Sequence, residues 1–180
     1  MRGAGIVRSD TPAVCAVELA PGGGPELADA SPGTVVAAHL LAEAAITAPA
    51  TAIEIGGDPD QVVAELADRT GSGARMALLV IADGAACHGD AAPGRRDDRA
   101  GPFDARIVLA LEAGDPAALT VACADPALSI ALLAGVDPLR VLAGVTAGRP
   151  PDEAQVLYSG APMGVGYVVG SWCWTVGEPA

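Results

Sequence analysis

The sequence contains no lysine, and all ten of its basic residues are arginines. This absence excludes enzymes that form a lysine Schiff base, use a lysine as general base, or bind phosphate with the lysine of a P-loop. Basic residues are also outnumbered, at 10 against 22 acidic ones, which gives a formal net charge of −12. Because this charge repels phosphate backbones, we expect no nucleic-acid partner.

Aromatic residues make up only 3% of the chain, so the core of this alanine-rich protein must be built from Val, Leu, Ile and Ala. The four cysteines form no C-x-x-C pair, and we therefore expect free thiols, no zinc site and a cytoplasmic location. The apolar runs are broken by Gly, Asp or Pro before they reach the length of a membrane span, so no membrane partner is expected. With 180 residues that are 51% hydrophobic, we expect one domain over residues 1–180.

Short strands alternate with helices in the first half of the chain. Hydrophobic patterns and turn residues predict a strand at 13–19, a flexible loop at 21–25, a helix at 34–47, a strand at 51–55 and a helix beginning at Pro59. Met76 to Ala82 is a continuous apolar run, which is typical of a strand covered on both faces. This order predicts an α/β fold, a three-layer sandwich whose central, mostly parallel or mixed sheet is flanked by helices.

An irregular segment at 83–101 follows that apolar run and is too long for an ordinary connection in a small domain. Such a loop at the end of a central strand often carries function. An amphipathic helix is then expected to run from Pro102 to Ala113. Its apolar side carries Phe103, Ile107, Ala110 and Leu111. Its charged side chains, Asp104, Arg106 and Glu112, are expected to face water.

The last third of the chain is punctuated by aspartate–proline pairs. Asp115, Asp125 and Asp137 each precede a proline, and each pair predicts a capped short helix. Two closing strands, at 154–158 and 164–174, are expected to return to the sheet. The glycines of the second strand predict close backbone packing. The two strands together carry four aromatic residues: Tyr158, Tyr167, Trp172 and Trp174. We expect Tyr167 and Trp172 in the core, and an aromatic group of this kind is also consistent with a homodimer.

Two stretches carry a resemblance to a known family. VIADGAACHGDAAPGRRDDRAGPFDARIVLALEAGDPAAL and the later GAPMGVGYVVGSW resemble the class III extradiol ring-cleavage dioxygenases of the LigB type. In that family a strand leads into a small-residue loop, a histidine, a loop with Pro and Arg, and a helix beginning near a Phe-Asp pair. The likeness covers about Met76 to Trp172, and the first 75 residues resemble a shortened amino-terminal half.

The resemblance implies a LigB-like α/β sandwich and a non-haem Fe(II) centre. In the family, two histidines and one carboxylate hold the iron, and a further histidine, matched here by His88, acts as acid and base on the substrate. Three histidines are therefore needed, whereas this chain has only His39 and His88. His39 lies within the expected helix at 34–47 and is assigned to structure, so no residue is assigned as a metal ligand and no cofactor is expected.

These observations place the candidate site at His88, at the carboxyl end of the expected central strand. Its expected neighbours in a small-molecule pocket are Asp83, Gly84, Cys87 and Asp90, with Cys87 as a small apolar filler. We expect a non-catalytic, degenerate member of the superfamily that binds a small-molecule ligand near His88. One alternative is an active diverged dioxygenase, or a metal-dependent hydrolase, in which His88 is the acid/base and Fe(II) is the cofactor. Another is a structural subunit of a larger assembly.

Overall fold

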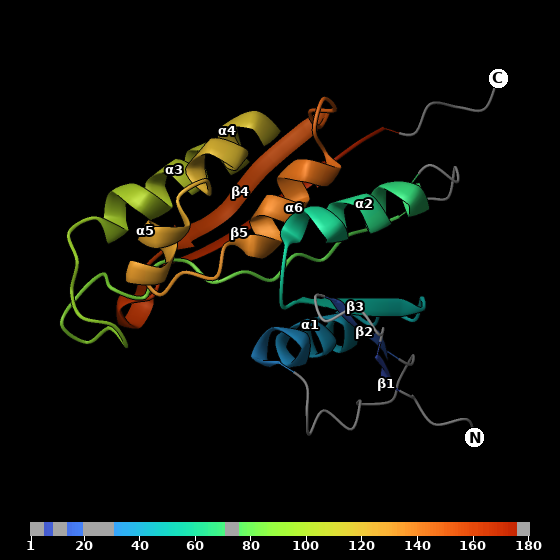
Figure 1. Ribbon diagram of the computed structural model, residues 1–180, viewed down its shortest axis with the longest axis horizontal. Coiled ribbons are helices and arrows are strands. Elements are labelled where there is room, and N and C mark those ends of the chain that lie inside the picture. The colour runs from blue at the N-terminus through green and yellow to red at the C-terminus, as the bar shows by residue number, and fades with distance from the viewer. Residues whose placement is uncertain (1–5, 9–13, 20–30, 71–75, 176–180) are drawn as a thin grey trace. The chain divides into compact units, whose positions relative to one another are not determined.

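The computed structural model of the protein describes residues 6–8, 14–19, 31–70 and 76–175 (Figure 1). Within these residues the fold is mixed α/β, with six α-helices and two small antiparallel sheets. Contacts divide the chain into two compact units, Met1–Ile81 and Ala82–Ala180, and each is described by itself. The single domain expected over residues 1–180 stays a prediction.

The first unit contains one antiparallel sheet and two helices. Its strands pair in the order β1-β2-β3, and the elements are β1 (Ile6–Arg8), β2 (Val14–Leu19), α1 (Pro32–Glu43), β3 (Ala50–Ile55) and α2 (Pro59–Thr70). The expected strands at 13–19 and 51–55 and the helix beginning at Pro59 are thus confirmed to within a residue or two. The loop expected at 21–25 lies outside the described residues.

A carboxylate on β3 holds the start of α1. Glu54 accepts hydrogen bonds at 2.7 Å from the Ser31 backbone N–H and at 2.7 Å from the hydroxyl of Thr34, which is buried. Burial by itself raises the pKa of Glu54, but these hydrogen bonds outweigh it and the pKa is lowered. The amino-terminal end of α1 is therefore fixed to the sheet by a side chain from a different element.

Helix α1 ends at Glu43, earlier than the expected Thr47. Ala45 adopts a left-handed φ of 52°, and the Ile46 N–H bonds back to the Leu41 carbonyl at 3.0 Å, which closes the helix. His39 lies on this helix with an exposed side chain.

The apolar run Met76–Ala82 does not form the expected central strand. These residues carry no strand assignment, and the first backbone pairing after them is an isolated antiparallel bridge between Asp83 and Gly135. Leu79 is 50% exposed. An apolar run indicates side chains that favour burial, but a strand also needs a neighbouring backbone with which to form hydrogen bonds. The described strands pair with one another and not with this run.

The second unit is built from helices packed along a β-hairpin. Its elements are α3 (Ala100–Glu112), α4 (Pro116–Ala122), α5 (Pro126–Ala131), α6 (Asp137–Val145), β4 (Glu153–Gly160), a 3-10 turn (Pro162–Gly164) and β5 (Tyr167–Cys173). Helix α3 runs along β4 and β5, and α4 contacts both α3 and α6 (Figure 1). The core between them is formed chiefly by Phe103, Ile107, Leu119, Leu132, Val136 and Leu139.

Two of the three expected aspartate caps are confirmed. Asp115 accepts from the Ala117 N–H at 2.9 Å, and Asp125 accepts from the Leu128 N–H at 2.9 Å. Asp137 does not cap α6, because the chain is already in a helical conformation at Val136 and this places Asp137 inside the first turn.

The two closing strands pair with each other and with no other described strand. β4 and β5 are antiparallel, with Glu153 opposite Cys173 and Gly160 opposite Tyr167. A short connection allows only antiparallel pairing, so the parallel or mixed sheet expected from the sequence is not formed by these strands. Tyr167 is 50% exposed and does not join the core, contrary to expectation. Trp172 is half-buried and donates its indole N–H to the Leu111 carbonyl at 2.7 Å.

Replacement of the core aromatic of α3 tests this packing. Phe103→Ala should lower the free energy of unfolding by about 3–5 kcal/mol, because the ring is 1% exposed and its removal leaves a cavity. Leu109→Ala on the same helix is the matched control, since Leu109 is 63% exposed and should change stability little. Urea unfolding followed by circular dichroism measures both, and equal losses for the two variants would contradict the packing of α3.

Candidate functional site

The irregular segment between Asp83 and Arg99 is bound to three other parts of the second unit. Its backbone bonds are Asp83 N–H to Gly135 O (3.2 Å), Ala86 N–H to Leu132 O (2.9 Å), His88 N–H to Gly164 O (3.1 Å) and Gly166 N–H to Ala85 O (2.9 Å). The partners are the turn after α5, the 3-10 turn and the residue just before β5. The segment that carries His88 is therefore a positioned part of the fold.

His88 is paired with a carboxylate from α3. Its Nε2 lies 2.6 Å from Oδ2 of Asp104, and the two side chains are 18% and 17% exposed. The other oxygen of Asp104, Oδ1, accepts the Ala85 N–H at 3.0 Å. One carboxylate therefore binds both the backbone and the imidazole of the loop.

Asp104 was expected to face water, and the structure corrects this. In α3 it lies one turn after Ala100, whose side chain is fully buried, and next to the buried Phe103. Side chains four residues apart share one face of a helix, so the Ala100–Asp104 spacing was the signal that could have placed this carboxylate near the core. The apolar side of the expected helix was defined by hydrophobic residues alone and therefore did not include Asp104.

Close glycine packing makes room for the pair. A Cβ on Gly84 would lie 2.5 Å from the Gly166 carbonyl oxygen, and a Cβ on Gly166 would overlap Oδ2 of Asp104. Gly164 has a left-handed φ of 79°, and a Cβ added there would lie 2.5 Å from the Cβ of Ala92. The close backbone packing expected for Gly164-Val165-Gly166 is therefore confirmed.

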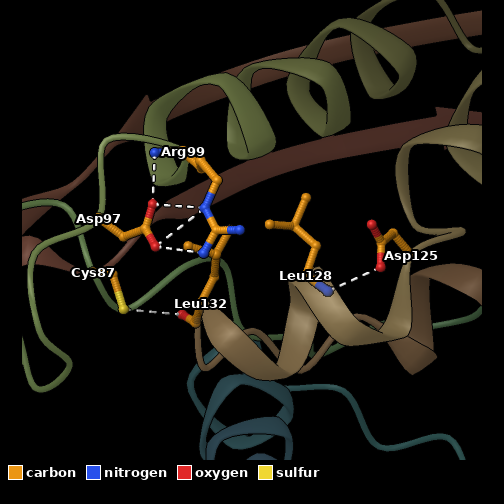
Figure 2. A network of polar contacts seen from close by, with 6 residues as sticks. All are labelled: Cys87, Asp97, Arg99, Asp125, Leu128 and Leu132. Atoms are coloured by element: carbon orange, nitrogen blue, oxygen red, sulfur yellow. Dashed lines mark hydrogen bonds and ion pairs between the residues drawn. The ribbon is translucent and has the colours of Figure 1, made fainter.

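The other predicted pocket residues have different environments. Asp83 is exposed and pairs through its backbone with Gly135, while Gly84 packs against Gly166. Cys87 is 2% exposed, and its thiol donates to the Leu132 carbonyl at 3.5 Å (Figure 2). This placement agrees with its role as a small apolar filler.

Asp90 lines a hollow formed by the segment that follows His88 along the chain. This open hollow has a volume of about 480 Å³, and its lining is Gly89, Asp90, Gly94, Arg95, Arg96 and Asp98. The two arginines and two aspartates give it charges of both signs. His88 itself is the residue next to Gly89 along the chain and is not part of the lining.

An arginine fork, the ion pair of Arg99 with Asp97, lies at the end of the loop. Asp97 binds the guanidinium of Arg99 through both carboxylate oxygens, the shortest contact being 2.7 Å from Nη2 to Oδ2 (Figure 2). The Asp97 backbone N–H donates to the Cys87 carbonyl at 2.9 Å. The hydrogen bonds from Arg99 lower the pKa of Asp97 to about 2. Asp97 is therefore ionised in the folded protein at all but strongly acidic pH.

The iron centre implied by the resemblance needs three imidazoles at one site, two for the metal and one for proton transfer. The chain has two histidines, and Nε2 of His88 is directed at Asp104. In the part of the chain that the structure describes, no three His, Cys, Asp or Glu side chains are arranged to hold a metal ion. The residues present therefore do not fit the family's iron centre.

Comparisons of this chain with protein families, with curated proteins and with solved structures found no match. None of the helices that the structure describes is long and apolar enough to cross a membrane.

The packing of Gly166 against Asp104 can be tested by adding one methyl group. Gly166→Ala should destabilise the protein by about 1–3 kcal/mol, because the new Cβ displaces the carboxylate that holds His88 and Ala85. Gly101→Ala is the matched control, since its Cβ meets no atom within 4 Å and alanine favours a helix by about 0.5–1 kcal/mol. If Gly166→Ala unfolds at the same urea concentration as wild type, the close approach is disproved.

Acid unfolding tests the fork between Asp97 and Arg99. A carboxylate whose pKa falls from 3.8 to about 2 on folding stabilises the protein above pH 4, and this contribution is lost as the pH drops through about 2. The difference in stability between wild type and Asp97→Asn should thus be constant above pH 5 and shrink between about pH 4 and pH 2. Urea unfolding at each pH measures it, with Asp98→Asn as a neighbouring one-charge control. A difference that does not depend on pH would contradict the fork.

Proposed function

We propose that this chain is a non-catalytic member of the class III extradiol dioxygenase superfamily that binds a small molecule beside His88. The observation that carries the proposal is the engagement of His88: its Nε2 is held 2.6 Å from Asp104, and the same carboxylate accepts the Ala85 N–H. The residue that matches the family's acid/base histidine thus also serves to hold the loop in place.

The number of histidines supports the loss of ring cleavage. The family's chemistry needs two imidazoles on iron and a third, unligated one for proton transfer. Here the second histidine, His39, is an exposed residue of α1. One chain therefore cannot assemble the family's set, however its parts are arranged.

The hollow formed by the residues that follow His88 along the chain supports binding of a polar small molecule. Arg95 and Arg96 supply hydrogen-bond donors and positive charge, and Asp90 and Asp98 supply acceptors and negative charge. Loops held by a rigid scaffold are common places for such sites. A ligand with both donor and acceptor groups suits this lining.

One observation favours the alternative, an active diverged dioxygenase or metal-dependent hydrolase that uses His88 as acid/base. Within the described residues Nδ1 of His88 has no protein partner. Every buried side-chain nitrogen or oxygen among these residues has a partner, so an atom without one is not buried. Nδ1 is therefore reached by solvent. An imidazole held by a carboxylate at one nitrogen and open at the other is the arrangement that proton-transfer enzymes use.

Three further expectations belong to the proposal. The three-layer LigB-like sandwich is proposed for the complete fold on the strength of the sequence resemblance. A homodimer is proposed because Tyr158 and Tyr167 on the β4–β5 hairpin are about half exposed. The cytoplasmic location rests on the absence of a cysteine pattern typical of disulfides.

Metal content and ring cleavage test the proposal together. Protein purified without chelators should hold well under one Fe or Zn per chain by elemental analysis, and should not cleave catechol when Fe(II) is supplied, as followed by absorbance. About one tightly held metal ion per chain, with turnover, would establish the alternative. In that case His88→Ala should abolish turnover, whereas the matched variant His39→Ala should retain it.

A further inference from the structure

The two groups that Asp104 binds differ in one chemical respect. The Ala85 backbone N–H, at 3.0 Å from Oδ1, can only donate a hydrogen bond. Nε2 of His88, at 2.6 Å from Oδ2, is a donor in one tautomer of the neutral ring and an acceptor in the other. Because an ionised carboxylate has no proton to give, its pair with a neutral imidazole is satisfied only when the ring proton is on Nε2.

We propose that Asp104 is the positioning residue that sets the tautomer of His88, so that Nδ1 is presented as a hydrogen-bond acceptor. This inference rests on the proposed binding of a small molecule beside His88 and names the class of ligand that would be recognised there. Such a ligand carries an O–H or N–H group that donates to Nδ1. A ligand with only acceptor groups at that position is disfavoured, because two acceptors repel each other.

The surroundings of His88 keep the ring in this orientation. Its own backbone N–H donates to the Gly164 carbonyl at 3.1 Å, so the main chain of His88 is anchored as well as its side chain. Gly166 packs directly against Oδ2 of Asp104, which prevents the carboxylate from moving away. The imidazole is 18% exposed, and its Nδ1, which has no partner among the described residues, is reached by solvent.

The fixed donor at Ala85 makes the effect of an isosteric substitution predictable. In Asp104→Asn the amide oxygen must face the Ala85 N–H, since the alternative would oppose two donors. The amide NH₂ then points at Nε2 of His88 and donates to it. The imidazole proton is therefore expected to move from Nε2 to Nδ1, which reverses the tautomer without changing the size of the side chain.

The presence of only two histidines makes a spectroscopic test direct. Nitrogen-15 NMR of the imidazoles, at a pH where both rings are neutral, distinguishes the protonated from the unprotonated nitrogen of each ring. His39, exposed on α1, is the internal control, and a His39→Gln variant assigns the signals of His88. Wild type should show His88 with a protected proton on Nε2, whereas the signals of His39 should be averaged by exchange with water.

The Asp104 variants supply the decisive comparison. Asp104→Asn should move the His88 proton to Nδ1, and Asp104→Ala should give His88 the averaged signals of His39. Circular dichroism checks that each variant is folded. If a variant does not fold, the wild-type spectrum alone tests the proposal. A wild-type His88 with its proton on Nδ1, or with averaged signals like those of His39, overturns it. Unchanged signals of His88 in folded Asp104→Asn overturn it as well.

Phenol and anisole separate this inference from the proposed function. Phenol offers an O–H donor and should shift the Nδ1 signal of His88 but not that of His39. Anisole has the same ring without the O–H and should shift neither, and folded Asp104→Asn should lose the response to phenol. If the tautomers follow the expectation but phenol has no effect, ligand binding beside His88 is disproved while the role of Asp104 stands. A response of His88 to anisole equal to that to phenol disproves the ligand class.

Discussion

The carboxylate of Asp104 is the constraint on which the organisation of the second unit depends. It joins helix α3 to a loop with no regular secondary structure, by binding the Ala85 N–H and the imidazole of His88. The Ala85 carbonyl of this loop accepts a hydrogen bond from the Gly166 N–H. The loop therefore also holds the residue that directly precedes β5. Charge-assisted hydrogen bonds of this kind are stronger than neutral ones, and two of them converge on one side chain.

This arrangement has consequences for both stability and chemistry. The glycines at 84, 164 and 166 are needed because backbone and carboxylate approach more closely than any Cβ allows. The Ala85 N–H holds one oxygen of the Asp104 carboxylate, and the other oxygen makes the two nitrogens of the imidazole unlike. A side chain that stabilises the loop therefore also determines which proton-transfer or hydrogen-bonding role His88 can take. The arginine fork of Asp97 holds the far end of the loop, next to the hollow lined by Arg95 and Arg96.

Local structure that depends on neighbouring residues was predicted well at most positions. Proline after aspartate located the starts of α4 and α5, because the carboxylate and the first-turn N–H groups that it caps are only two or three residues apart. The same pattern predicted a cap at Asp137, and this prediction was wrong. Val136 already has a helical conformation, so the helix starts one residue earlier and Asp137 lies inside its first turn. Met76–Ala82 was expected as a strand and is not one, because pairing depends on a partner that a single segment does not specify.

The sequence by itself determined the composition of the core, the starts of most helices, the close packing of the late glycines and the limit of two imidazoles that this chain can supply to a site. These properties depend on residue type and on short separations along the chain. The pairing of β4 with β5, the exposure of Tyr167 and the contact of His88 with Asp104 required the folded chain. Each of them is set by which distant segments meet, and a surface-type residue such as aspartate gives no sign of its partner until those segments have packed.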